Sequence, residues 1–357
     1  MTPTATSIPL GRLTDALSER SVTASAPCRV DFGGTLDIST FHYPLRALSP
    51  ATVNIALDLR TTVTLHPHRE DAVRVTSRGF DDAVFAPGKA PYDHPLGLTF
   101  AVADCFGASG LHIAIDSTSP PKSGLGGSSV AAVALIAAFS KLGMRLGRPA
   151  IDPSEIVLTA HAVEQSVAGV PCGMQDQLAA AYGGVTKWRW TADPVRTPFD
   201  RRPLVAEADL PRLDRHLMVA YLGVTHVSRD VNSTWVRQFI AGTHREQWHR
   251  IVRLTHDFAG ALSRWDMRAA GQAMNRETAL RKAMTPQVLD AMGDRLAIAA
   301  TATGCGARFT GAGGGGCLWA LGETDAIAAL RPKWEALLSK RDTAALLDCR
   351  VDAQGAL

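Results

Sequence analysis

Hydrophobic and polar residues alternate along several stretches of the first third of the chain, the pattern of half-buried β-strands. In ATVNIALDLRTTVTLHP (51–67), every second residue from Val53 to Leu65 is apolar except Thr61. These side chains are predicted to line one face of a long strand. The stretches APCRVDF (26–32) and LHIAIDS (111–117) predict two more strands, and the former runs into a glycine turn, GGTLD (33–37).

Two helices are predicted after these strands. The first covers roughly residues 128–142, a run of small and apolar helix formers. The second begins at Asp152-Pro153-Ser154-Glu155, where a capping aspartate precedes a proline at the first helical position and a glutamate in the first turn. We expect this helix to end near Val167.

The second half of the chain has a different order of elements. LMVAYLG (217–223) predicts a strand, and most of 231–303 has a helical pattern. ARFTGAGGGGCLWAL (307–321) predicts two strands joined by a glycine loop, followed by an amphipathic helix over 324–341 and a last strand near 345–351. Because strands and helices do not alternate regularly, we predict an α+β protein with domains at 21–204 and 205–357.

Composition and charge narrow the classes of function. The chain has 357 residues, a net charge of +3 and 46% hydrophobic residues, and its basic residues are scattered. These values predict no nucleic-acid partner. We found no segment approaching a membrane span and no basic, apolar leader, so we expect a cytoplasmic protein without a membrane partner. The six cysteines form no CxxC pair and are expected to be reduced and structural.

The stretch SPPKSGLGGSSVAA (119–132) places glycines and serines directly before an apolar helix. Glycines allow close approach of the backbone, and the start of a helix offers unpaired N–H groups and partial positive charge. This combination suits a phosphate group, although a plain proline-glycine turn would also fit. The Walker string GxxxxGK is absent. GxGxxG occurs at Gly311, Gly313 and Gly316, but a strand rather than a helix follows it, so a dinucleotide site is disfavoured.

Three stretches, APCRVDFGGTLD, PPKSGLGGSSVAA and RFTGAGGGGCLW, resemble in order and spacing the three motifs of the GHMP small-molecule kinases. The resemblance spans roughly residues 26–322. It implies an N-terminal domain with a left-handed βαβ crossover, a ferredoxin-like C-terminal domain and ATP in the cleft between them. It implies ATP and Mg²⁺ as cofactors, and a monomer or homodimer. The expected nucleotide-binding residues are Pro121, Lys122, Ser123, Gly124, Leu125, Gly126, Gly127, Ser128, Ser129, Gly311, Gly313 and Gly314.

The same resemblance implies residues for the chemistry. Ser128 and Glu164 align with the family's Mg²⁺ ligands, and Asp176 aligns with the aspartate that faces the acceptor hydroxyl. Arg29 is expected to pair with Asp176, keep it ionised and stabilise charge on the transferred group. Other interpretations stay open: Glu164 as a solvated helix charge, Asp176 as a helix N-cap, Lys122 as a solvated lysine, and Arg29 in an unrelated structural ion pair.

The acceptor is expected to be a sugar or sugar phosphate, phosphorylated at its anomeric C1 hydroxyl. DQLAAAYGG (176–184) and YLGVTHVSRDVN (221–232) resemble segments of the sugar-1-kinases in this superfamily. The first motif departs from their pattern, because Leu36 separates Thr35 from Asp37. Asp37 is the best candidate for binding sugar hydroxyls, and Thr35, His42, Gly173 and Tyr182 are weaker ones. For a phosphate on the acceptor, the available arginines are Arg201, Arg202 and Arg229.

Three other functions remain possible. A kinase of a non-sugar alcohol, such as mevalonate or homoserine, would use the same motifs. A non-catalytic ATP-binding protein would keep the fold, but Arg29, Glu164 and Asp176 together argue against it. A dinucleotide-dependent oxidoreductase would rest on GAGGGG alone.

Overall fold

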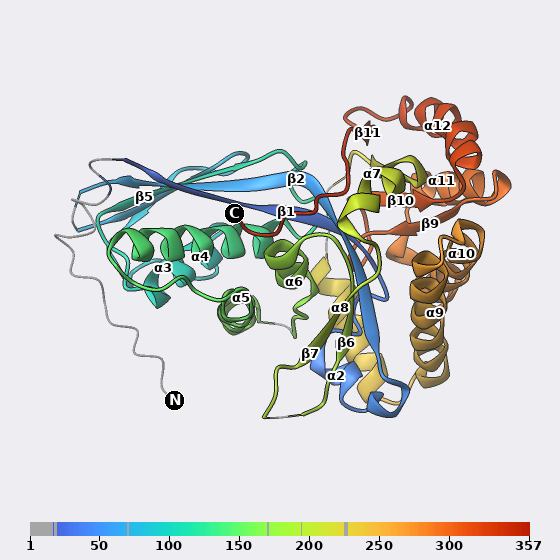
Figure 1. Cartoon of the computed structure of the whole chain (residues 1–357), viewed down its shortest axis with the longest axis horizontal. Coiled ribbons are helices and arrows are strands. Elements are labelled where there is room, and N and C mark those ends of the chain that lie inside the picture. The colour runs from blue at the N-terminus through green and yellow to red at the C-terminus, as the bar shows by residue number, and fades with distance from the viewer. Residues whose placement is uncertain (1–16, 18–19, 70, 170, 194, 225–227) are drawn as a thin grey trace.

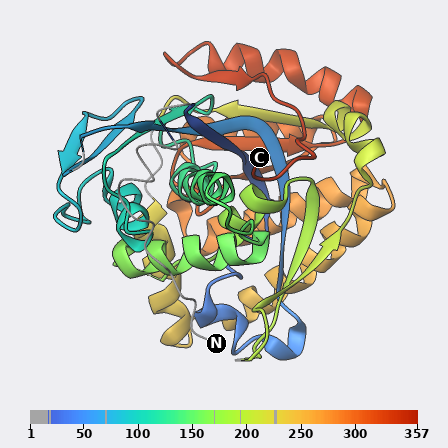
Figure 2. The same ribbon diagram turned by 60° about the vertical axis from the view of Figure 1, so that its left-hand side comes forward.

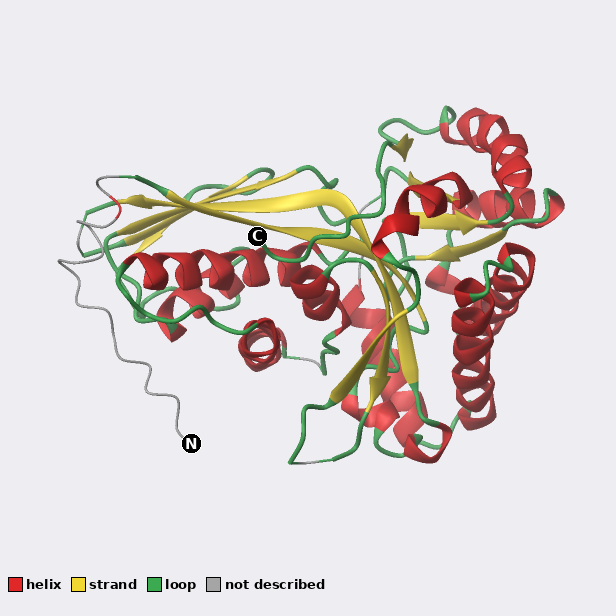
Figure 3. Cartoon of the chain, viewed as in Figure 1, coloured by secondary structure: helices red, strands yellow, loops and turns green. Residues whose placement is uncertain are grey.

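The computed structural model describes residue 17 and residues 20–69, 71–169, 171–193, 195–224 and 228–357 (Figure 1). The chain forms two sheets, each accompanied by helices, and Figure 3 shows helices lying along one side of the longer sheet. The two-domain α+β organisation expected from the sequence is confirmed.

The first sheet is built on one long strand, β2. Its order is β4-β3-β5-β2-β6-β7, and β1 also pairs with β2. Strands β3 and β5 are parallel, and the other pairs are antiparallel. The bounds are β1 Val22–Phe32, β2 Ala51–Pro67, β3 Val73–Ser77, β4 Ala83–Phe85, β5 Leu111–Ser117, β6 Val185–Trp190 and β7 Phe199–Pro203.

The helices between Gly97 and Tyr182 lie on the side of this sheet shown below it in Figure 1. Figure 2 shows α4 and α5 on the same side of the strands. The bounds are α2 Ser39–His42, α3 Gly97–Cys105, α4 Gly127–Arg145, α5 Pro153–Ala168 and α6 Gln175–Tyr182. As the sequence predicted, the Asp152 side chain caps α5 by accepting a hydrogen bond from the backbone N–H of Ser154.

The sequence was expected to contain no segment that resembles a membrane span, and helix α4 does not fit this expectation. It is the one helix among the described residues that is long and apolar enough to cross a membrane. However, 72% of that apolar window is buried inside the protein. The apolar run therefore reflects a core helix covered on almost every side.

The second sheet has the order β11-β8-β10-β9, and each of its pairs is antiparallel. In chain order this is 4-1-3-2, with helices between the first and second strands and between the third and fourth, the arrangement of a ferredoxin-like domain. The bounds are β8 Leu217–Tyr221, β9 Gly306–Phe309, β10 Cys317–Leu321, β11 Ala345–Leu347, α7 Leu210–Leu213, α8 Ser228–Ile240, α9 Arg245–Ser263, α10 Met267–Met284, α11 Ala291–Ala302 and α12 Thr324–Leu338.

The last residues of the chain return to the first domain, as Figure 1 shows. Val351 bridges to Leu57 of β2, and the backbones of Leu357 and Ser25 exchange two hydrogen bonds. Arg60 forms an ion pair with Asp352. The C-terminal segment therefore connects the second domain back to the first, and the boundary at residue 205 stays a prediction.

Strand β2 has the predicted bounds, but the predicted alternation of buried and exposed side chains holds only in its second half. Beyond Asp58 the buried residues alternate with less buried ones, whereas Ala51–Leu57 are buried on both faces. The domains meet at this first half: the Phe32 ring of β1 stacks on Phe258 of α9 with centroids 4.2 Å apart. Because Phe32 pairs with Val53, this contact lies on the face that alternation assigned to the core. On the opposite face, Asn54 donates a hydrogen bond to Gln175 of α6 at 3.2 Å.

Four fully buried charged side chains join the domains. Arg308 donates to Asp31 at 2.9 Å and to Glu277 at 2.8 Å, and Arg281 also donates to Glu277 at 2.8 Å. Asp31 in turn accepts a hydrogen bond from the backbone N–H of Gly311 at 2.6 Å. We call Asp31, Glu277, Arg281 and Arg308 the interdomain charge cluster.

Removal of one member of this cluster leaves buried charge without a partner, which is strongly destabilising. We expect Arg308→Met to lower the free energy of unfolding by about 3–5 kcal/mol in urea denaturation. The control is Arg74→Met, which removes an exposed arginine 2.6 Å from Asp82 and should cost less than about 1 kcal/mol. Equal losses in the two variants would contradict a structural role for the cluster.

Candidate active site

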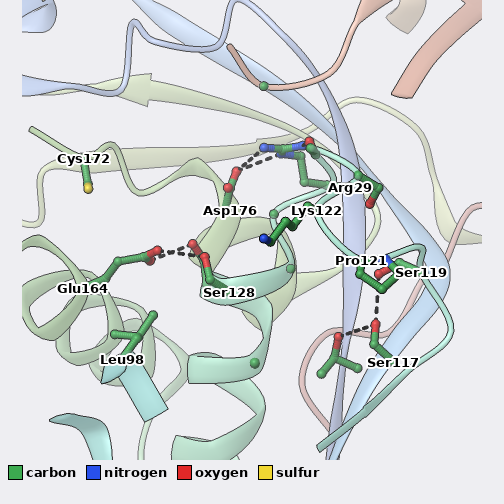
Figure 4. A pocket seen from close by; sticks show the side chains of 18 of the residues that line it. Arg29, Leu98, Ser117, Ser119, Pro121, Lys122, Ser128, Glu164, Cys172 and Asp176 are labelled. Atoms are coloured by element: carbon green, nitrogen blue, oxygen red, sulfur yellow. Dashed lines mark hydrogen bonds and ion pairs between the residues drawn. The ribbon is translucent and has the colours of Figure 1, made fainter. Parts of the chain in front are cut away.

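A cavity of about 420 Å³ lies where the three glycine-containing stretches meet (Figure 4). The first stretch contributes Arg29, Thr35 and Asp37, the loop and first turn at 119–129 form one wall, and Gly311 and Ala312 come from the third stretch. Helices α5 and α6 add Glu164 and Asp176. Residues more than 280 positions apart in the chain therefore share one site.

The loop before α4 is shaped to approach an anion. Its backbone takes φ values of +74° at Gly124 and +86° at Gly126, conformations that favour glycine. Gly126 is the N-cap of α4 and offers no side chain to the free N–H groups of the first turn. A Cβ at this position would come within 3.1 Å of the Asp176 carboxyl group. The helix start can thus offer its N–H groups and partial positive charge to a phosphate.

The residues expected to bind nucleotide do not all face the cavity. Pro121, Lys122, Ser123, Gly124, Gly126, Gly127, Ser128 and Ser129 line it. Leu125 does not: its side chain is fully buried, and its carbonyl oxygen accepts a hydrogen bond from the backbone N–H of Arg29. Leu125 therefore connects the loop to β1. Its apolar side chain gains more free energy in the core than it would in the cavity.

Most glycines of the third stretch pack behind the cavity wall and do not line the cavity. Gly311 and Ala312 line the cavity, but Gly313 and Gly314 pack against Val288 instead, and Gly314 donates its N–H to the Val288 carbonyl oxygen. A Cβ at Gly316 would overlap the Ser123 carbonyl oxygen. The glycine run therefore allows close packing against the loop at 119–126, and it leads into β10 rather than a helix, as expected of a loop that is not a dinucleotide fingerprint.

Arg29 and Asp176 form the ion pair expected from the sequence. Arg29 contacts the Asp176 Oδ1 atom through Nε at 2.8 Å and Nη2 at 2.6 Å, and its Nη1 donates to the Gly124 carbonyl oxygen at 2.8 Å. Asp176 lies in the first turn of α6, whose N-cap is Met174, so Asp176 is not the cap. One guanidinium group therefore joins the glycine loop to a carboxylate in the cavity.

The pKa of Asp176 is raised overall, although the sequence predicted a stabilising effect of Arg29 on the ionised form. Burial raises the pKa of its carboxyl group, and Arg29 lowers it by a smaller amount. The ion pair with Arg29 thus reduces the rise in pKa that burial causes but does not cancel it. A carboxylate whose pKa lies above its usual range is a stronger base, which suits proton removal from a hydroxyl group.

Glu164 is enclosed by neutral hydrogen-bond donors. It accepts hydrogen bonds from Ser128 Oγ at 3.1 Å, Ser129 Oγ at 2.7 Å and Gln177 Nε2 at 2.6 Å, and burial raises the pKa of its carboxyl group to about 7. These contacts contradict the interpretation of Glu164 as a solvated helix charge. Within the described part of the chain, no lysine or arginine forms an ion pair with it.

The donor set around Glu164 fits a magnesium ion. A partly buried carboxylate that lacks a basic partner gains from a cation, and carboxylate and hydroxyl oxygens are ligands that Mg²⁺ accepts alongside phosphate oxygens and water. Glu164 and Ser128 would hold the ion beside the start of α4. Ser129, which also donates to Glu164, is more deeply buried than Ser128.

The opposite part of the cavity carries Asp37. Its Oδ2 accepts a hydrogen bond from the backbone N–H of Gln175 at 3.1 Å, while its buried Oδ1 has no partner. Gly173 leaves the space that the carboxylate occupies, because a Cβ there would overlap it. Thr35 lines the same region. The Asp37 oxygen without a partner can accept a hydrogen bond from a ligand hydroxyl.

Two expected acceptor residues lie outside the cavity lining. His42 is buried at the end of α2, where its ring lies 4.9 Å from the ring of Tyr43. Tyr182 ends α6, and its ring contacts Trp188 and lies under Arg201. Tyr182 is six residues after Asp176, a rotation of about 240° around a helix, so the two cannot face the same side.

The arginines considered for a phosphorylated acceptor do not strengthen that possibility. Arg201 and Arg202 are exposed on β7, and neither lines the cavity. The Arg229 side chain lies outside the described residues, as do residues 225–227 of the segment YLGVTHVSRDVN.

Sequence reasoning missed one end of the cavity. The residues that line it there are four apolar ones, Phe80, Leu96, Leu98 and Ile115, and five polar ones, Thr61, Ser77, Arg78, Ser117 and Ser119. Thr61 donates to Ser117 at 3.0 Å, and the Ser117 and Ser119 hydroxyls lie 2.9 Å apart. The signal available in the sequence was the strand LHIAIDS, which leads directly into the glycine loop.

Two family models match the chain in order. The model described as GHMP kinases N terminal domain matches residues 96–184, and the one described as GHMP kinases C terminal matches residues 258–340. The first contains the glycine loop, Glu164 and Asp176, and the second contains Glu277, Arg308 and the third stretch.

The similar proteins include some named mevalonate kinase and others named as kinases of sugars or sugar phosphates. A mevalonate kinase from Pyrococcus horikoshii is 28% identical over 226 residues, and the match covers 59% of each chain. A galactokinase from Roseiflexus sp. is 27% identical over 317 residues, covering 78% of this chain and 79% of that protein. A solved D-glycero-D-manno-heptose 1-phosphate kinase from Bacteroides thetaiotaomicron superposes with a TM-score of 0.72 at 18% identity, covering 94% of this chain and 97% of that one. At this identity the structural similarity concerns the fold.

The environment of Asp37 predicts a pH-dependent stability. Burial raises the pKa of Asp37 to about 7, so between about pH 4 and pH 7 the folded protein holds a proton that the unfolded chain has released. The free energy of unfolding contributed by Asp37 therefore falls as pH rises through this window. Replacement by Asn should remove on the order of 2 kcal/mol of that decrease.

The measurement is urea denaturation of the wild type and Asp37→Asn at pH 5 and pH 8. The difference between the wild type and the variant is compared, because half-buried histidines such as His161, whose pKa burial lowers, act in the opposite direction. Parallel pH dependences in the two proteins would show that Asp37 does not hold a proton in the folded state.

Proposed function

We propose that this chain, which belongs to the GHMP kinase superfamily, transfers the terminal phosphoryl group of ATP to a hydroxyl group of a small polyhydroxylated acceptor. One observation carries the proposal: the glycine loop at the start of α4, the Glu164 group and the Arg29–Asp176 pair line a single cavity. Phosphoryl transfer needs binding of the phosphates, neutralisation of their charge and a base beside the acceptor, and these features supply one each.

Each group of residues in the cavity has a separate role in the proposed reaction. N–H groups of the loop at 124–127 bind the phosphates, and the end of the cavity near Phe80 and Leu98 takes the adenosine. Glu164 and Ser128 hold Mg²⁺, which neutralises phosphate charge when bound. Asp176 accepts the proton of the acceptor hydroxyl as that oxygen attacks phosphorus, and Arg29 stabilises the charge that develops.

Asp37 favours a neutral, hydroxyl-rich acceptor such as a sugar. Its Oδ1 is buried without a partner and can accept a hydrogen bond from a hydroxyl. Above about pH 7, where its carboxyl group is ionised, it would repel a carboxylate group. The resemblance of residues 176–184 to sugar-1-kinases supports phosphorylation at the anomeric C1 hydroxyl.

A mevalonate-type acceptor is the second candidate. The observation in its favour is the similarity to relatives named mevalonate kinase, among them the one from Pyrococcus horikoshii. Its carboxylate would need a cation near Asp37. Of the basic residues that the structure describes in the cavity lining, Arg29 is engaged by Asp176 and Gly124, and Arg78 donates to the carbonyl oxygens of Ser117 and Ser119. Lys122 lies in the glycine loop.

The test is a coupled ADP-release assay with Mg·ATP and a panel of free aldoses, aldose phosphates, homoserine and mevalonate. Reactions without acceptor give the background of ATP hydrolysis. We expect a sugar to give the highest kcat/KM, and phosphorus NMR of its product to show the phosphate coupled to the anomeric proton. A phosphate on a primary hydroxyl would overturn the position, preferred turnover of mevalonate would overturn the sugar, and no turnover of any compound would overturn the kinase.

A further inference from the structure

Arg281 belongs to α10 of the C-terminal domain, yet its guanidinium group reaches the turn that carries Thr35 and Asp37. Its Nη2 donates to the Gly34 carbonyl oxygen at 2.5 Å, and its Nη1 donates to Thr35 Oγ1 at 3.3 Å. The side chain is fully buried. Arg281 does not itself line the cavity.

The guanidinium group is fixed on its other sides. Glu277 accepts from Nε at 2.8 Å, and the rings of Trp235 and Trp248 lie with their centroids 4.6 and 4.5 Å from the central guanidinium carbon. Aromatic faces attract a guanidinium ion, and the carboxylate orients its plane. Arg281 therefore presents two N–H donors to the turn in a fixed direction.

The turn needs such support because its backbone is strained. Thr35 has a φ of +80°, in the left-handed region that a β-branched residue rarely adopts. A strained residue persists only when its surroundings hold it. Two residues later, Asp37 presents its buried oxygen without a partner. The conformation at Gly34 and Thr35 therefore determines where the Asp37 carboxylate lies.

We propose that Arg281 is a positioning residue for the acceptor, which acts from the C-terminal domain by holding Gly34 and Thr35 so that Asp37 meets the acceptor hydroxyls. The inference rests on the proposed function, in which Asp37 contacts the acceptor. Through Glu277, the same contact ties the acceptor side of the cavity to Arg308, Asp31 and the N–H of Gly311 on the nucleotide side.

Arg281→Lys tests the proposal while keeping a positive charge beside Glu277 and the tryptophans. Lysine lacks the planar fork, so it cannot reproduce both donations to the turn. We expect the KM for the best acceptor of the panel to rise about tenfold, and the Kd of Mg·AMPPNP to stay within about twofold by calorimetry. Amide hydrogen exchange in peptides covering 33–38 should become faster.

Two further variants separate positioning from lost stability. Trp334→Phe removes a buried indole that donates to Leu296 on the far side of the C-terminal domain, and it should lower the Tm without changing the KM or the exchange of 33–38. Thr35→Val removes the hydroxyl that Arg281 contacts. If Arg281 acts through Thr35, the double variant should raise the KM less than the product of the two single effects.

An unchanged KM in Arg281→Lys, strictly multiplicative effects in the double variant, or an equal KM change in Trp334→Phe would overturn the proposal. If no compound of the panel is phosphorylated, the proposed function fails, and hydrogen exchange decides the positioning role alone. In that case, exchange of 33–38 that is unchanged in Arg281→Lys would overturn it.

Discussion

The guanidinium group of Arg29 is the contact on which the arrangement of the cavity depends. It donates to the Asp176 carboxylate and to the Gly124 carbonyl oxygen from a strand that pairs with β2 along its length, so Asp176 and the glycine loop share one contact. A buried arginine that satisfies two such partners has little freedom to move. The distance between the glycine loop and the Asp176 carboxylate is therefore set by β1.

The interdomain charge cluster extends this constraint across the molecule. Asp31 follows Arg29 by two residues on the same strand, and their side chains approach within 3.7 Å. From Asp31 the contacts continue through Arg308 and Glu277 to Arg281 and back to the turn at 34–35. A buried chain of alternating charges holds its members in place because loss of any one exposes its neighbours to an uncompensated charge. The C-terminal domain thereby contacts both ends of the candidate site, whose Arg29, Glu164 and Asp176 lie in the N-terminal domain.

The local sequence pattern predicted most of the helices and strands, but it did not predict the interdomain charge cluster. The alternation in 51–67 and the cap at Asp152 depend on neighbouring residues, so a single sequence contains them. The pairing of Arg29 with Asp176 followed from the family resemblance. Glu277, Arg281 and Arg308 are ordinary helix or strand residues in the sequence, and only the approach of the two domains buries them together. Tyr182 and His42 were misplaced for a related reason: proximity in sequence to Asp176 and Asp37 does not put a side chain on the same face.

The central claim is that Asp176, held by Arg29, removes the proton of the acceptor hydroxyl. The most direct measurement compares kcat and nucleotide affinity in Asp176→Asn, which keeps the shape of the side chain and removes its basicity. We expect a fall in kcat of about a hundredfold or more, with the Kd of Mg·AMPPNP changed by less than about threefold. A variant that keeps a kcat close to that of the wild type would contradict the assignment of Asp176 as the base.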